Sequence, residues 1–126
     1  FLEKKLKKNN LNFKDIVFVG FSQGTMVALN LALTIKKEIM GVLGYSGGVI
    51  LTKSGKIEIC SKPNICLVHG NDDEVVPKKM METTKEVLIK NNINTKAHLI
   101  KNLGHGINQE GLEIGQNFLV KYLLKC

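Results

Sequence analysis

The sequence DIVFVGFSQGTMVALNLALTI, residues 15–35, decides the fold. Its first six residues form a short apolar run that ends in glycine, as is typical of a strand buried on both faces of a parallel sheet. Residues 25–35 are apolar almost all round and predict a buried helix that begins near Ser22. Lys36 and Lys37 follow this helix, where cations complement the negative end of its dipole. A buried strand followed directly by a helix is the repeating unit of α/β proteins.

The same alternation continues on both sides of this stretch. Residues 1–9 resemble the end of an amphipathic helix, with Leu2 and Leu6 four positions apart. Further strands are expected at residues 40–45, 65–69 and 95–100, further helices at 78–91 and 108–124, and a connector of unassigned structure at 49–64. We therefore predict the fold class as α/β, with a mainly parallel sheet of about four strands flanked by helices.

The composition restricts the class of protein further. The 126 residues, 44% hydrophobic and 23% charged, fit one globular domain. No apolar run approaches the roughly 18 residues that a membrane-spanning helix needs, so stable membrane insertion is not expected. The net charge is +7, but all 18 basic residues are lysine. Because arginine is the residue that reads guanine edges and stacks on bases, a nucleic-acid partner is not expected either.

The cysteines and the first residues bear on location and completeness. Cys60, Cys66 and Cys126 form an odd set without a CxxC pair, which favours reduced thiols in a cytoplasm over disulfides or a metal site. Residues 1–10 are too charged for a secretory signal. The chain opens with Phe1 rather than methionine, which indicates a fragment, a processed product or a displaced start. We expect a cytoplasmic, truncated single domain.

Residues 20–24, GFSQG, carry the first chemical signal. A GxSxG sequence between a strand and a helix is the pattern of a nucleophile elbow, which exposes a serine on a sharp turn. Flanking glycines let neighbouring elements approach closely, and the N–H groups at the helix N-terminus stabilise a negative oxygen. The alternative is an ordinary turn in which Ser22 caps the helix.

A nucleophilic serine needs a base, and the base needs an acid to orient it. Asp73 follows the third expected strand, and His105 follows the fourth. The order Ser, Asp, His along the chain is that of α/β-hydrolases. Because the carboxyl ends of parallel strands meet at one edge, Ser22, Asp73 and His105 are expected to lie close together.

Three other polar residues compete for these roles. Asp72 is adjacent to Asp73, and spacing alone does not separate the two carboxylates. His69 ends a strand and is interpreted as structural, and His98 lies within a strand as a half-exposed sheet residue.

These motifs together resemble the carboxylesterase/lysophospholipase group of the α/β-hydrolase superfamily, which includes acyl-protein thioesterases. The resemblance is to the C-terminal portion of that fold and covers most of residues 12–126. The matching motifs are GFSQGT at 20–25, HGNDDEVVP at 69–77 and NLGHGI at 102–107, and the Ser46-Gly47 turn is similar too. The family's acid motif, HGxxDxVVP, places the acid on Asp73.

The resemblance implies a mechanism. Ser22 would attack an ester or thioester carbonyl, His105 would take and return the proton, and Asp73 would orient the imidazole. The Gln23 backbone N–H would be an oxyanion donor. The implied substrate is a small-molecule or lipid ester, and no metal or cofactor is needed.

The sequence departs from the family in length. The missing part is an N-terminal half whose glycine-rich loop normally supplies a second oxyanion donor. Without it, residues 15–20 would form an unpaired, apolar sheet edge. The alternatives are therefore an inactive fragment or remnant, and another branch of the superfamily such as a dienelactone hydrolase or peptidase. The expected partner is the missing N-terminal half or a second copy of the chain.

Overall fold

The computed structural model describes residues 1–124. Its elements are α1 (Leu2–Lys8), a 3-10 turn η1 (Phe13–Asp15), β1 (Val17–Phe21), α2 (Gln23–Thr34), β2 (Gly41–Tyr45), β3 (Asn64–Gly70), α3 (Lys78–Lys90), β4 (Thr95–Ile100) and α4 (Gln109–Leu123). This order is the predicted one. β1 begins two residues later than expected because Asp15 belongs to η1, where its side chain and that of Asn12 form a capping box.

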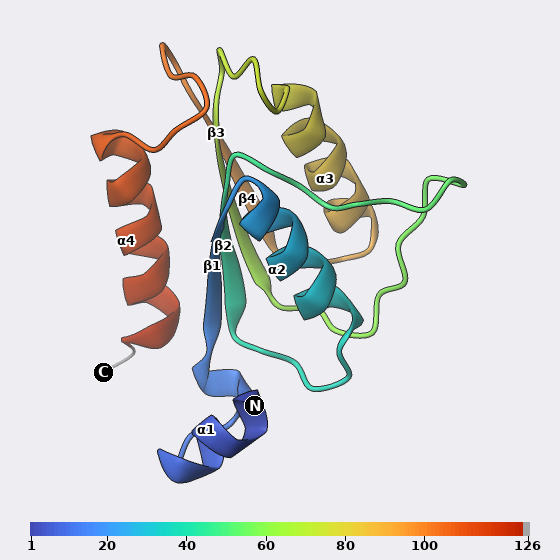
Figure 1. Ribbon diagram of the computed structural model, residues 1–126, viewed down its shortest axis with the longest axis vertical. Coiled ribbons are helices and arrows are strands. Elements are labelled where there is room, and N and C mark those ends of the chain that lie inside the picture. The colour runs from blue at the N-terminus through green and yellow to red at the C-terminus, as the bar shows by residue number, and fades with distance from the viewer. Residues whose placement is uncertain (125–126) are drawn as a thin grey trace.

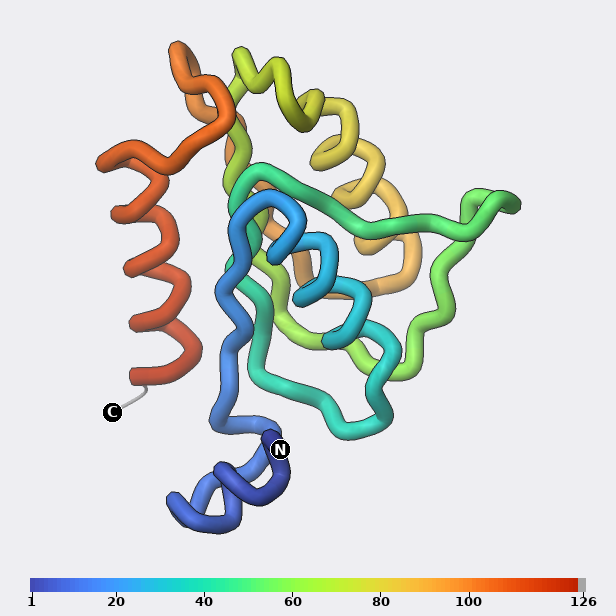
Figure 2. Tube along the Cα trace, in the orientation of Figure 1, coloured from blue at the N-terminus to red at the C-terminus, as the bar shows by residue number. Residues whose placement is uncertain are grey.

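In the described part of the chain, the strands form one parallel four-stranded sheet in the order β1-β2-β3-β4. Helices α2 and α3 cover one face and α4 covers the other (Figure 1). The predicted fold class is confirmed. The first helix, α1, lies at the end of the sheet where the strands begin, opposite the loops that follow their carboxyl ends (Figure 2).

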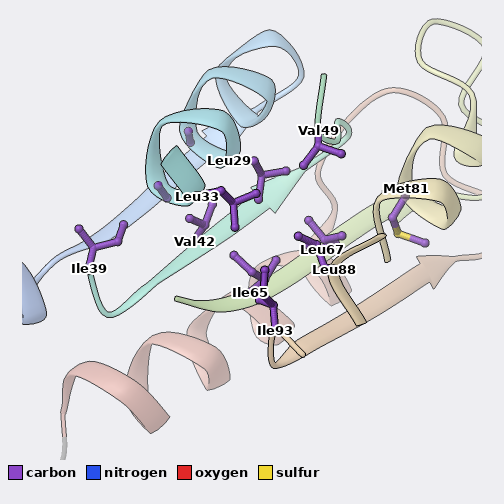
Figure 3. Close-up of a cluster of buried hydrophobic side chains, with 12 residues drawn as sticks. Leu29, Leu33, Ile39, Val42, Val49, Ile65, Leu67, Met81, Leu88 and Ile93 are labelled. Carbon is purple, nitrogen blue, oxygen red and sulfur yellow. The ribbon is translucent and has the colours of Figure 1, made fainter. Parts of the chain in front are cut away.

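Two clusters of buried side chains hold the helices to the sheet. On the α2 and α3 face, Leu29 and Leu33 of α2 lie over Val42, and Leu88 of α3 lies beside Leu67 (Figure 3). On the α4 face, Phe118 packs with neighbours that include Tyr45 and Cys66. Residues that alternate along β3 therefore belong to opposite clusters, as expected for a strand that is covered on both faces.

β1 differs from the expectation of a strand buried on both faces. Among residues 1–124 it pairs only with β2, and Val19 and Phe21 are 58% and 42% exposed. The α2 side chains of Val27 and Leu31 are also exposed, so this helix is not buried all round. Apolar grooves of about 710 Å³ and 670 Å³ flank β1 on its α4 and α2 sides. The expected unpaired apolar edge is confirmed.

Within residues 1–124, no helix combines the length and the apolar character needed to cross a membrane.

Candidate active site

Ser22 occupies the turn between β1 and α2 in a strained backbone conformation, with φ 55° and ψ −117°. A positive φ is uncommon for a residue other than glycine, and it persists only where the surroundings hold it. The Ser22 N–H donates to the carbonyl oxygen of Tyr45 at 2.8 Å, and the Thr25 hydroxyl donates to the same oxygen at 2.7 Å. Ser22 holds the N-cap position of α2, but within residues 1–124 its side chain makes no capping hydrogen bond, which counts against the alternative in which its hydroxyl only caps the helix.

The glycines around Ser22 have unequal roles. A Cβ on Gly20 would lie 2.6 Å from the carbonyl carbon of Gly24 and from the nitrogen of Thr25. A Cβ on Gly47 would lie 2.6 Å from the Ser22 carbonyl oxygen. Close approach therefore requires both of these glycines. A Cβ on Gly24 would meet nothing within 4 Å, so the expectation that both glycines of the motif permit close approach holds only for Gly20.

Asp73 lies in the turn after β3, residues 71–77, which we call the acid turn, and its side chain is fully buried. Its Oδ1 accepts the backbone N–H groups of Val75 at 2.9 Å and Val76 at 2.8 Å. Its Oδ2 lies 2.8 Å from Nδ1 of His105. Asp72 is exposed and its carboxylate contacts Asn71 instead. The structure thus brings His105 together with Asp73 and not with Asp72.

Burial alone would raise the pKa of the Asp73 carboxyl, because it removes water from the charge. The hydrogen bond with His105 and the backbone N–H groups of Val76 and Val75 act in the opposite direction, and the positive charge of a protonated His105 adds to them. Together they hold the pKa of Asp73 below its ordinary value. The acid turn is therefore built to keep a buried carboxylate ionised.

His105 lies in the loop between β4 and α4, with a side chain that is 19% exposed. The backbone N–H of Asp72 donates to the Leu103 carbonyl oxygen at 2.9 Å and ties this loop to the acid turn. Gly70 permits the approach, because a Cβ there would collide with the carbonyl oxygens of Leu103 and Gly104. The His105 ring lies 4.9 Å, centroid to centroid, from that of Phe21, the residue before Ser22.

The first N–H groups of α2 have no partner within the helix. The backbone N–H of Gln23 is the first after Ser22, and it donates to no acceptor among residues 1–124. A group at this position is available to an oxygen that approaches Ser22.

The two remaining histidines differ. His98, in β4, is half buried, and burial and the nearby Lys96 lower its pKa while Glu110 partly opposes them. His69 is 1% exposed at the end of β3, and its Nε2 lies 2.8 Å from the Val76 carbonyl oxygen and 3.4 Å from Asp73 Oδ2. The sequence analysis missed this contact. The available signal was its position at a strand end, four residues before the acid.

The described side chains of His, Cys, Asp and Glu form no group of three that could hold a metal ion. Cys60 and Cys66 are both free, and burial raises the pKa of the Cys66 thiol to about 11. Cys126 lies outside the described residues.

Comparison with known families gives a match to the phospholipase/carboxylesterase family over residues 1–123. The chain belongs to this family. It is 31% identical over 116 residues to acyl-protein thioesterase 1 of Neurospora crassa, covering 87% of the chain and 47% of that relative. It is 30% identical over 122 residues to acyl-protein thioesterase 1 homolog 2 of Dictyostelium discoideum, covering 94% of the chain and 54% of the relative.

Solved structures give the same fold. The crystal structure of esterase PE8 superposes with a TM-score of 0.90 and 35% identity, over 98% of this chain and 57% of that one. The Bacillus cereus carboxylesterase superposes with a TM-score of 0.80 at 19% identity, which supports the fold alone. The chain of this phospholipase/carboxylesterase family member thus spans about half the length of the relatives that it matches.

Proposed function

We propose that the protein is a serine hydrolase that cleaves carboxylic ester or thioester bonds. The observation that carries this proposal is the hydrogen-bonded pair of Asp73 and His105. The pair lies at the carboxyl ends of the strands, as does Ser22 in its strained turn. The names of the relatives, acyl-protein thioesterases and esterases, support the kind of bond cleaved. The proposed substrate is a small-molecule or lipid ester.

The hydrogen bond between Asp73 and His105 supports a role of His105 as the base. A carboxylate only accepts hydrogen bonds, so the short contact between His105 and Asp73 places a proton on His105 Nδ1. When the imidazole is neutral, the other ring nitrogen, Nε2, carries no proton and can take the proton of the Ser22 hydroxyl. Asp73 acts here by holding the imidazole in this tautomer.

The reaction then follows in two halves. The Ser22 oxygen bonds to the substrate carbonyl carbon while His105 takes its proton, and the tetrahedral intermediate collapses as His105 returns that proton to the leaving alcohol or thiol. Water, activated by His105, releases the acid from the acyl-enzyme and restores Ser22. The Gln23 N–H stabilises the oxyanion in both halves.

The test is hydrolysis of p-nitrophenyl butyrate by the purified protein and by Ser22→Ala. Ser54→Ala is the matched control, because Ser54 is an exposed serine in the turn that contains Thr52 and Lys56. We expect activity in the wild-type protein and in Ser54→Ala, and loss in Ser22→Ala. Equal activity in all three would contradict the proposal.

We also propose that the exposed edge of β1 receives the remainder of the family fold. Relatives are about twice as long as this chain, and apolar grooves flank β1 on both sides. Because a sheet edge of this kind is an aggregation liability, an apolar neighbour is expected to cover it. Without that neighbour the chain would act as a poorly active fragment, since loss of one oxyanion donor lowers kcat by about 10²–10³-fold.

Co-expression with an N-terminal half from a relative tests this partner. A heterodimer with raised esterase activity is the expected result, whereas a homodimer that excludes the added half would contradict it. The single truncated domain of residues 1–126 and the cytoplasmic location stay predictions, the latter supported by the free thiols of Cys60 and Cys66.

A further inference from the structure

His69 is a buried histidine that the mechanism above does not use. Its side chain is fully buried at the carboxyl end of β3, on the face where Ile65 and Leu67 belong to the core under α2 and α3. A histidine at a fully buried position is uncommon unless its ring nitrogens have specific partners. The partners of His69 lie in the acid turn.

The protonation of the His69 ring follows from these contacts. Nε2 lies 2.8 Å from the carbonyl oxygen of Val76, and a carbonyl oxygen only accepts, so Nε2 carries a proton. Nδ1 is buried and has no partner within residues 1–124. A proton on that nitrogen would be a buried donor without an acceptor, so the geometry favours the tautomer with Nε2–H and a bare Nδ1.

Val76 connects this histidine to the acid. Its N–H donates to Asp73 Oδ1 at 2.8 Å, and its carbonyl oxygen accepts from His69. The Nε2 atom itself lies 3.4 Å from Asp73 Oδ2, the oxygen that bonds to His105, but its hydrogen bond is with Val76. His69 is therefore joined to Oδ1 of Asp73 by two successive hydrogen bonds through Val76, and its ring lies against Oδ2.

We propose that His69 is a positioning residue for the candidate triad, holding the acid turn so that Asp73 Oδ2 faces His105. This inference rests on the proposed function. Within the described chain, the hydrogen bond and ion-pair contact of His69 are with Val76 and Asp73 and not with Ser22 or His105, so it acts through the orientation of Asp73. Its loss leaves the Val76 carbonyl oxygen without its donor and lets the turn rotate.

Two substitutions separate the hydrogen bond from the bulk of the ring. His69→Gln keeps a nitrogen donor close to the position of Nε2, and His69→Phe keeps a planar ring without a donor. His98→Gln is the control, because His98 lies in β4 and, among residues 1–124, makes no hydrogen bond or ion pair with the acid turn. We expect a loss of about 10–10²-fold in kcat for His69→Phe with KM unchanged, the size that a small misplacement of a reacting group produces. His69→Gln and His98→Gln should stay near the wild-type value.

NMR of the protein labelled with ¹⁵N-histidine gives a readout that needs no turnover. In the wild-type protein the His69 nitrogen shifts should report Nε2–H and a bare Nδ1. The His105 Nδ1–H, held by Asp73, should give a proton signal far downfield of the amides. This signal should persist in His69→Gln and disappear in His69→Phe, because the released proton exchanges with water.

The outcomes decide the proposal in each case. A protonated Nδ1 on His69 in the wild-type protein overturns it, as does an unchanged His105 signal in folded His69→Phe. If His69→Phe does not fold, the His69 tautomer in the wild-type protein and the spectrum of His69→Gln test the proposal. Loss of the His105 signal in folded His69→Gln then overturns the proposal. Equal hydrolysis by the wild-type protein and Ser22→Ala would instead contradict the proposed function, whatever the histidine spectra show.

Discussion

Asp73→Asn is the substitution whose effect the structure defines most closely. The amide oxygen of asparagine must replace Oδ1, because that position accepts two backbone N–H groups, from Val75 and Val76. The amide nitrogen then replaces Oδ2 and faces Nδ1 of His105 at 2.8 Å. An NH₂ group there can only donate, so His105 must carry its proton on Nε2, and this nitrogen no longer accepts the proton of Ser22.

The wrong tautomer of a triad histidine lowers kcat by about 10⁴-fold in serine hydrolases. This factor corresponds to about 5.4 kcal/mol of transition-state stabilisation, since each tenfold step is 1.36 kcal/mol. The assay is kcat and KM for p-nitrophenyl butyrate, and the fold is checked by urea unfolding. Asp72→Asn is the matched control, because Asp72 is exposed and not bonded to His105. A folded Asp73→Asn protein within tenfold of the wild-type kcat, beside an inactive Ser22→Ala, would refute the reasoning.

Three further predictions follow from the same geometry. Gly20→Ala should destabilise the fold by about 1–3 kcal/mol, because the added Cβ meets backbone atoms. Gly24→Ala should be neutral or stabilising, because its Cβ meets nothing within 4 Å. Equal urea unfolding midpoints for the two variants would contradict this. The hydrogen bonds that lower the pKa of Asp73 stabilise the fold fully above the unfolded-state pKa of about 3.9, and this contribution is lost as pH falls through the lower folded-state pKa. Urea unfolding from pH 7 to acid should show that loss in the wild-type protein and a smaller one in Asp73→Asn. Val19→Lys, on the exposed edge of β1, should reduce self-association of the chain in light scattering, and an unchanged mass would contradict the role of that edge.

The fold was largely predictable from the sequence because the spacing of apolar residues is a local property. The run at residues 15–20 and the helix after it predict β1 and α2, and the structure confirms both with small shifts in their ends. The exposure of β1 shows the limit of that reasoning. An apolar sequence indicates a preference for burial, but whether a neighbour covers Val19 depends on which other segment packs beside β1, and that is not a local property of these residues.

The candidate site was predictable in its residues but not in its contacts. Spacing could not separate Asp72 from Asp73, because the two are adjacent. In the structure the backbone N–H groups of Val75 and Val76 converge on Asp73, and that convergence depends on the path of the turn. The contact of His69 with this turn was missed for the same reason. The catalytic roles of Ser22, Asp73 and His105 stay predictions until the variants are assayed.

The exposed edge and the candidate site are physically connected, because Ser22 directly follows β1. A strained backbone persists only where its surroundings hold it, and Ser22 is held on one side through Tyr45 of β2. On the other side β1 has no strand partner among the described residues. Edge strands open more readily than central ones, since fewer hydrogen bonds must break. A strand added to β1 would therefore stabilise the conformation of Ser22 as well as cover Val19. If an N-terminal half like that of the longer relatives packs on β1, as proposed above, we expect it to raise activity in two ways, by supplying an oxyanion donor and by holding Ser22 in place.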